Sequence, residues 1–186
     1  MGKRLFIAVD IDDATREQVG RIASRLREQI GSAAKASWVR PDRMHLTLQF
    51  FADADDGLEQ SVRAALAHMP PAAVFDLTLE GLGSFPTRGS PRVLWLGVGA
   101  GVPELRRIQN ALGRGVGVSP GHEESFTPHL TLARFRDRVP REKLSQIADI
   151  RAYAGPSRID RVTLYESRLS PAGPTYLPLA QAPLMT

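Results

Sequence analysis

The chain has 186 residues, 42% of them hydrophobic and 24% charged, which is ordinary for a globular protein of one domain or two small lobes sharing a core. The absence of cysteine excludes disulfides and thiolate chemistry, and no apolar run approaches the roughly 20 residues of a membrane span. The formal net charge of +4 rests mostly on arginine, which modestly favours a phosphate-bearing partner.

The first part of the chain alternates predicted strands and amphipathic helices. Its opening apolar run is too short for a signal peptide and lacks a small-residue cleavage site, so a cytoplasmic location is expected. Asp10, Asp12 and Asp13 follow this run, and we interpret them as helix-capping residues in preference to metal ligands. The expected elements are a strand at 5–9, a helix ending at 30, a strand at 45–51, a helix at 58–69 and a strand at 75–80.

The second part repeats this alternation after a turn-rich connection. The expected elements are the connection at 83–91, a strand at 92–98, a helix around 105–112, a glycine-punctuated loop at 113–121, a strand at 129–135, a short helix beginning at Pro140, a strand at 159–165 and an edge strand at 174–179. A helix follows the strands at 45–51 and at 129–135. The pattern therefore predicts an α+β fold whose two related halves meet at a groove, within a single domain spanning residues 1–186.

A four-residue sequence containing histidine occurs twice, at His45–Leu48 and at His129–Leu132, in a chain with four histidines. Side chains alternate faces along a strand, so in each copy the histidine and the threonine two residues later share one face, and the two leucines share the other. A chance pair of Leu- and Thr-rich strands is the simpler alternative, but strand formation does not require the repeated imidazole. We therefore predict that both strands line one groove with His45, Thr47, His129 and Thr131.

Two histidines and two threonines are suited to acid–base chemistry on a phosphate. One imidazole can take a proton from water while the other gives a proton to a leaving oxygen, because histidine titrates near neutral pH. Threonine hydroxyls can donate to phosphate oxygens, and arginine can balance the charge there. No acidic third ligand stands at a fixed spacing in either copy, so neither a zinc site nor another cofactor is expected.

Aromatic residues near the first copy offer a possible base-stacking surface. Trp38, Phe50 and Phe51 could each stack on a nucleobase. Core packing is the alternative, and we favour it for Phe50.

The chain resembles the 2H phosphoesterase superfamily and, within it, the RNA 2′,3′-cyclic phosphodiesterases, also called 2′-5′ RNA ligases. That family is defined by two His-x-Thr-x motifs, which match the two repeated sequences here. Similarity extends over nearly the whole chain and includes Arg4–Ala8, Trp38–Val39, Pro91–Val98, Thr127–Pro128, Ala133–Arg134 and Tyr176.

The resemblance implies a two-lobed, pseudo-symmetric fold with mostly antiparallel sheets lining a central cleft and helices packed outside. It also implies metal-independent hydrolysis of a 2′,3′-cyclic phosphate, on an RNA end or a nucleotide, to a 2′-phosphate. His45 would be the general acid and His129 the base, with Thr47, Thr131 and Arg134 binding the phosphate. Strict alternation would turn Arg134 away from His129, so a bulge or the end of the strand must turn it inward.

Two other functions remain open at this point. The same chemistry run backwards would join RNA ends through a 2′-5′ bond, and a binding module would hold an RNA end without turnover. The sequence does not set the oligomeric state; a monomer is the default expectation, with no membrane association.

Overall fold

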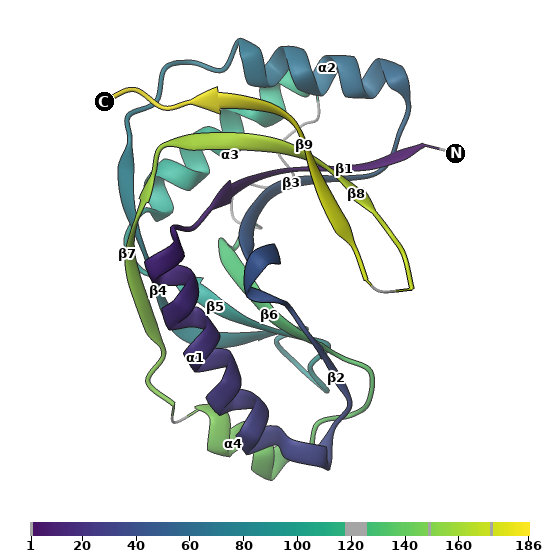
Figure 1. Cartoon of the computed structure of the whole chain (residues 1–186), viewed down its shortest axis with the longest axis vertical. Coiled ribbons are helices and arrows are strands. Elements are labelled where there is room, and N and C mark those ends of the chain that lie inside the picture. The colour runs from purple at the N-terminus through teal and green to yellow at the C-terminus, as the bar shows by residue number, and fades with distance from the viewer. Residues whose placement is uncertain (1, 118–125, 149, 172) are drawn as a thin grey trace.

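The computed structural model describes residues 2–117, 126–148, 150–171 and 173–186. Within this part, nine strands form one sheet in the order β7-β4-β5-β6-β3-β1-β8-β9, with β2 attached to β6, and all pairings of the named strands are antiparallel. The sheet curls, with α2 at one end of the molecule and α1 and α4 at the other (Figure 1). The α+β class, the antiparallel strands and the outer helices are as predicted.

The chain contains two strand-helix-strand-helix runs, β1-α1-β3-α2 and β5-α3-β6-α4; β2 lies before β3, β4 lies between the runs, and β7, β8 and β9 follow the second run. Their bounds are β1 Lys3–Asp10, α1 Asp13–Ile30, β2 Ala36–Trp38, β3 His45–Ala54, α2 Asp56–Ala67, β4 Phe75–Phe85, β5 Val93–Val98, α3 Val102–Val116, β6 His129–Phe135, α4 Arg141–Ala148, β7 Tyr153–Ile159, β8 Arg161–Arg168 and β9 Thr175–Pro183.

The two halves of the chain exchange strands. After β1, α1, β3 and α2, the chain crosses to β4, which pairs with β5 and β7. After β5, α3, β6 and α4, the chain passes through β7 and reaches β8, which pairs with β1 and β9. β4, from the first half of the chain, therefore lies among strands of the second half, and β8 and β9, from the second half, extend the sheet beyond β1. The motif strands β3 and β6 lie side by side in the middle of the sheet.

Several predicted boundaries are wrong. Residues 36–38, which lie between the expected helix and the expected strand at 45–51, form β2 on the edge of β6. The strand expected at 159–165 corresponds to β8, and β7, which ends at Ile159, was not predicted. β4 continues through the start of the connection expected at 83–91, and α3 continues beyond the loop start expected at 113. Residues 118–125, the remainder of that expected loop, lie outside the described residues. The expected edge strand near the C-terminus is β9, which among the described strands pairs with β8 alone.

At two positions where a loop was expected, glycine is present because a neighbouring element packs closely against the backbone. A Cβ on Gly115 would lie 2.8 Å from the Cβ of Ala65, so this glycine lets α3 pack tightly on α2 while remaining helical. A Cβ on Gly83 would overlap the Trp95 indole, which lies across this position of β4 from the neighbouring strand. Glycine marks packing contacts at both positions.

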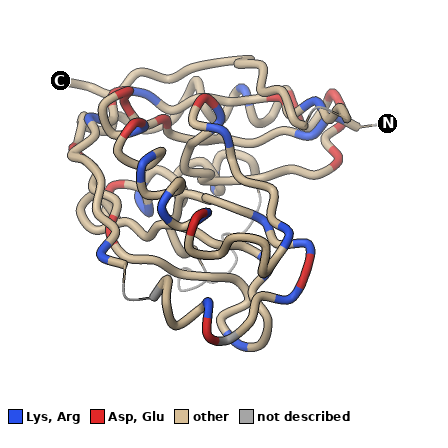
Figure 2. Tube along the Cα trace, turned by 60° about the horizontal axis from the view of Figure 1, so that its bottom comes forward, with Lys and Arg blue, Asp and Glu red and all other residues tan. Residues whose placement is uncertain are grey.

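The apolar core lies between the sheet and the helices, and both leucines of each motif belong to it: Leu46, Leu48, Leu130 and Leu132 are at most 4% exposed. Burying a leucine stabilises a fold by about 1.5–3 kcal/mol, so these side chains anchor the motif strands. Basic and acidic residues are intermixed along the trace (Figure 2), and net charge alone therefore marks no site. None of the described helices is long and apolar enough to cross a membrane.

Candidate active site

The two histidine strands are neighbours, paired through Leu46 and Leu130. Continuing this antiparallel register by one residue in each direction sets His45 opposite Thr131 and Thr47 opposite His129. The leucines on the opposite face are buried in the core, so the histidines and threonines face away from it. The two motifs therefore present their polar residues together, as the sequence predicts.

A bulge interrupts each motif strand at the same place. In the β5–β6 ladder, Trp95 pairs with Thr131 and Leu94 with Ala133, which leaves Leu132 as an extra residue on β6. In the β1–β3 ladder, Ala8 pairs with Thr47 and Ile7 with Gln49, which leaves Leu48 extra on β3. A bulge shifts the alternation by one residue. The residue five positions beyond each histidine, Arg134 or Phe50, therefore faces the same side as that histidine.

Two adjoining cavities, of about 530 and 90 Å³, contain all five predicted site residues, and together we call them the cleft. Both cavities are lined by His45, Thr47, His129, Thr131, Arg134 and Tyr176. Arg134 thus faces the cleft, as the bulge required. Phe50 also lines the larger cavity and is 48% exposed, so its predicted packing in the core is wrong. Phe51 is buried on the other face.

The two imidazoles make matching hydrogen bonds. Nδ1 of His45 lies 2.9 Å from the carbonyl oxygen of Arg43, and Nδ1 of His129 lies 2.8 Å from that of Thr127. A carbonyl oxygen only accepts, so Nδ1 carries the proton in both rings and donates it. Nε2 is therefore the nitrogen that gains and loses a proton in each histidine.

Aromatic rings hold each imidazole in place. Phe6 stacks on His45 with ring centroids 4.7 Å apart, and Tyr176 meets the same ring edge-on at 5.2 Å. On the other side of the cleft, Phe85 meets His129 edge-on at 5.1 Å, and Trp95 lies 5.7 Å away. These contacts restrict rotation of both rings, so their Nε2 atoms are fixed in direction before any ligand binds.

One carboxylate distinguishes the environments of the two histidines. Burial lowers the pKa of both imidazoles, each carbonyl contact raises it, and the positive charge of Arg134 lowers it. Asp10, paired with His45 in the β1–β3 ladder, additionally raises the pKa of His45. Oδ2 of Asp10 accepts a 2.7 Å hydrogen bond from the Tyr165 hydroxyl. Burial and this carboxylate both raise the pKa of Tyr165. The charge of Asp10 thus favours the protonated form of His45.

Asp10 was interpreted above as a capping residue, and that interpretation is wrong. Asp12 is the N-cap of α1, accepting a 2.7 Å hydrogen bond from the Thr15 amide, whereas Asp10 is the last residue of β1. Within the described residues, no group of three or more His, Cys, Asp or Glu side chains is arranged to hold a metal ion. Arg4 and Arg43 also line the cleft, although no motif marked them.

Asp10→Asn is expected to lower the pKa of His45 and to leave that of His129 unchanged. Asparagine keeps an oxygen for the Tyr165 hydroxyl but removes the charge that raises the pKa of His45. NMR titration of the imidazole C–H protons measures both values. Asp160→Asn removes a carboxylate bound to Arg161, outside the cleft lining, and serves as the control. An unchanged pKa at His45, or equal shifts at both histidines, would contradict the effect of the Asp10 charge on His45.

Comparisons with known proteins point to a single family. A sequence model described as "2'-5' RNA ligase superfamily" matches residues 11–170. The RNA 2′,3′-cyclic phosphodiesterase of Methanothermobacter thermautotrophicus is 34% identical over 95% of this chain and 96% of its own length. The protein of the same name from Archaeoglobus fulgidus is 33% identical, covering 93% and 96%. The crystal structure of E. coli LigT complexed with 3'-AMP matches at a TM-score of 0.74 and 27% identity, covering 99% and 98%.

Proposed function

Because this chain belongs to the 2′-5′ RNA ligase superfamily, we propose that it hydrolyses 2′,3′-cyclic phosphates on RNA ends or nucleotides to 2′-phosphates. The relatives named above as RNA 2′,3′-cyclic phosphodiesterases span almost its whole length, which supports transfer of the reaction class. The LigT complex with 3'-AMP supports a nucleotide as the ligand. The catalytic unit is the whole chain, since each half completes the other's side of the sheet.

In the proposed reaction, water attacks phosphorus while the bond to the 3′ oxygen breaks. Nε2 of His129 accepts the proton of the attacking water, and Nε2–H of His45 donates a proton to the departing 3′ oxygen. The products are a 2′-phosphate and a free 3′ hydroxyl. Each turnover leaves His129 protonated and His45 neutral, so proton exchange with solvent restores the starting state.

The assignment of acid and base follows the positions of the two motifs in the family, and one asymmetry around the two rings agrees with it. The acid must begin protonated and the base must begin neutral. Burial has the largest effect and lowers the pKa of both imidazoles. Asp10 partly opposes this effect at His45, whereas no carboxylate does so at His129 among the described residues. This difference supports His45 as the acid.

The other predicted site residues stabilise the phosphoryl group. Thr47 and Thr131 present hydroxyls beside the two imidazoles, where they can donate to the non-bridging oxygens. Arg134 supplies a positive charge to the same cavity, balancing the negative charge that builds up on phosphorus in the transition state. The observation that carries the proposal is the convergence of both His-x-Thr pairs and Arg134 on one cavity.

The test is incubation of the purified protein with a nucleoside 2′,3′-cyclic phosphate in the presence of a chelator, followed by ³¹P NMR. The expected product is the 2′-phosphate alone. A 3′-phosphate product would contradict the predicted leaving oxygen. Binding of the cyclic phosphate without turnover between pH 5 and 9 would instead support the binding module.

A further inference from the structure

The cleft contains three arginines that face no carboxylate partner among the described residues: Arg4, Arg43 and Arg134. No acidic residue lines either cavity. Unpaired guanidinium groups gathered in one cleft indicate an anionic ligand, and arginine is well suited to phosphate. Three such groups are more than the single negative charge of a cyclic phosphodiester requires.

Two carboxylates near Arg4 are engaged by other cations: Glu166, paired with Leu5 in the β1–β8 ladder, and Glu59, which binds Lys3. Glu166 binds Arg168 through two contacts of 2.9 and 3.0 Å. Glu59 binds Lys3 at 2.6 Å and Arg63 at 2.7 Å. Arg4, which lies next to Lys3 in β1, therefore remains available to an incoming anion.

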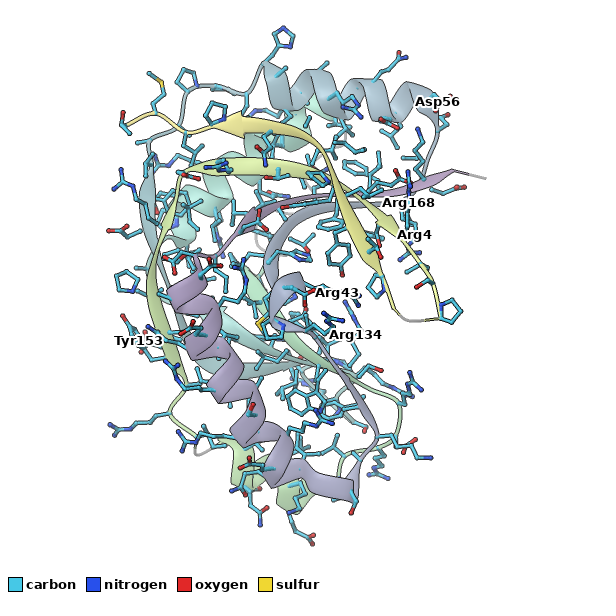
Figure 3. All side chains as sticks on the ribbon, viewed as in Figure 1. Arg4, Arg43, Asp56, Arg134, Tyr153 and Arg168 are labelled. Atoms are coloured by element: carbon cyan, nitrogen blue, oxygen red, sulfur yellow. The ribbon has the colours of Figure 1, made fainter. Side chains whose placement is uncertain are left out.

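The three arginines fall into two separate places. Arg43 and Arg134 line the small cavity together with both histidines. Arg4 lines only the larger cavity, and in Figure 3 it lies away from the other two, toward Arg168. The cleft therefore has one cationic place at the proposed reaction centre and a second one farther out.

The wall near Arg4 is apolar and exposed. Phe50 is 48% exposed and Leu169 is 65% exposed, and Pro174 completes this side of the larger cavity. The Arg4 guanidinium carbon lies 5.1 Å from the centroid of the Phe50 ring. Large apolar side chains exposed in a cleft indicate a ligand with an apolar face. The guanidinium beside them indicates that the same ligand also carries a negatively charged group. A nucleoside that carries a phosphate has both features.

The same wall lies on one side of the reaction centre only. Arg4 and Phe50 come from β1 and β3, and Leu169 and Pro174 come from the β8–β9 hairpin, all on the side of His45. If His45 protonates the leaving 3′ oxygen, the ribose bonded to that oxygen must lie on the same side. The remainder of that nucleotide then extends along this wall.

We propose that Arg4 binds the 5′-phosphoryl group of the terminal nucleotide whose 2′,3′-cyclic phosphate lies between the histidines. This subsite rests on the proposed function and makes it more specific. The preferred substrate is a cyclic phosphate with a phosphate on its 5′ side, as every RNA end longer than one nucleoside has. A nucleoside 2′,3′-cyclic phosphate leaves Arg4 unused.

The test compares adenosine 2′,3′-cyclic phosphate with its 5′-phosphorylated form. The wild type is expected to have a kcat/KM about 10–100-fold higher for the 5′-phosphorylated form, the value of one charged hydrogen-bonded contact. Arg4→Met is expected to abolish this preference, because it should lower kcat/KM for the 5′-phosphorylated form far more than for the unphosphorylated form. Arg4→Lys keeps the charge but loses the planar fork, so an intermediate preference is expected.

Arg168→Met is the matched control, because it removes a neighbouring arginine that already binds Glu166. It is expected to retain the preference. Equal rates for both substrates in the wild type, or an equal loss for both in Arg4→Met, would overturn the subsite and leave the proposed function standing. Turnover of neither substrate by the wild type would overturn both.

Discussion

His45→Ala and His129→Ala are each expected to lower kcat for a 2′,3′-cyclic nucleotide by about 10²–10⁴-fold, the usual contribution of one general acid or base. The two side chains act in the same step, so the loss in the double variant should be smaller than the product of the two single losses. Steady-state rates measured near the wild-type optimum give all three values. Substrate affinity should change far less than kcat.

His68→Ala is the matched control for both histidine variants. His68 also has Nδ1 at 2.9 Å from a carbonyl oxygen, that of Ala64, but it is exposed at the end of α2, outside the cleft lining. Its replacement is expected to leave kcat within about two-fold of the wild type. If either cleft variant behaves like this control, that histidine takes no part in the chemical step.

Arg134→Met is expected to lower kcat by about 10²–10³-fold, comparable to the loss of one preorganised donor at a developing negative charge. Arg134→Lys keeps the charge without the bidentate fork, so partial activity is expected. Rates should be measured across pH, because Arg134 also lowers the pKa of both histidines and its removal should raise both values. Comparing rates at each variant's own pH optimum separates the loss of phosphate stabilisation from the change in the histidine pKa values.

Arg136→Met is the control for this variant. Arg136 is exposed just beyond the end of β6 and lines neither cavity of the cleft. Its replacement is expected to leave the rate and the pH optimum unchanged. An Arg134→Met variant as active as this control would show that the phosphoryl group does not depend on Arg134.

The sequence was sufficient to predict the middle of the fold because two signals were strong there. The repeated His-Leu-Thr-Leu sequence fixed which side chains share a face, and helical spacing of apolar residues identified α1, α2 and α3. β7 escaped prediction because it contains small residues and Pro156, and Pro156 is compatible only with an edge strand. β2 has three residues, too few for any periodic signal.

Alternation alone could not predict the cleft wall. The family position of Arg134 requires a bulge or a strand end after the second motif, but nothing in the sequence indicates a matching bulge after the first. The bulge at Leu48 turns Phe50 toward the cleft, although a strict period of two assigns it to the core face. Asp10 was missed for a different reason: its partner, Tyr165, lies 155 residues away along the chain. Such a contact has no local sequence signature.

The pH dependence of kcat/KM in the wild type and in the single variants His45→Gln and His129→Gln tests most directly whether two imidazoles act on one phosphoryl group. The wild type is expected to give a bell-shaped profile centred below the ordinary histidine range, because burial lowers both pKa values. His129→Gln should lose the acidic limb, where the base becomes protonated, and His45→Gln should lose the alkaline limb, where the acid is deprotonated. A flat wild-type profile, or a variant that keeps both limbs, would contradict the two-histidine mechanism.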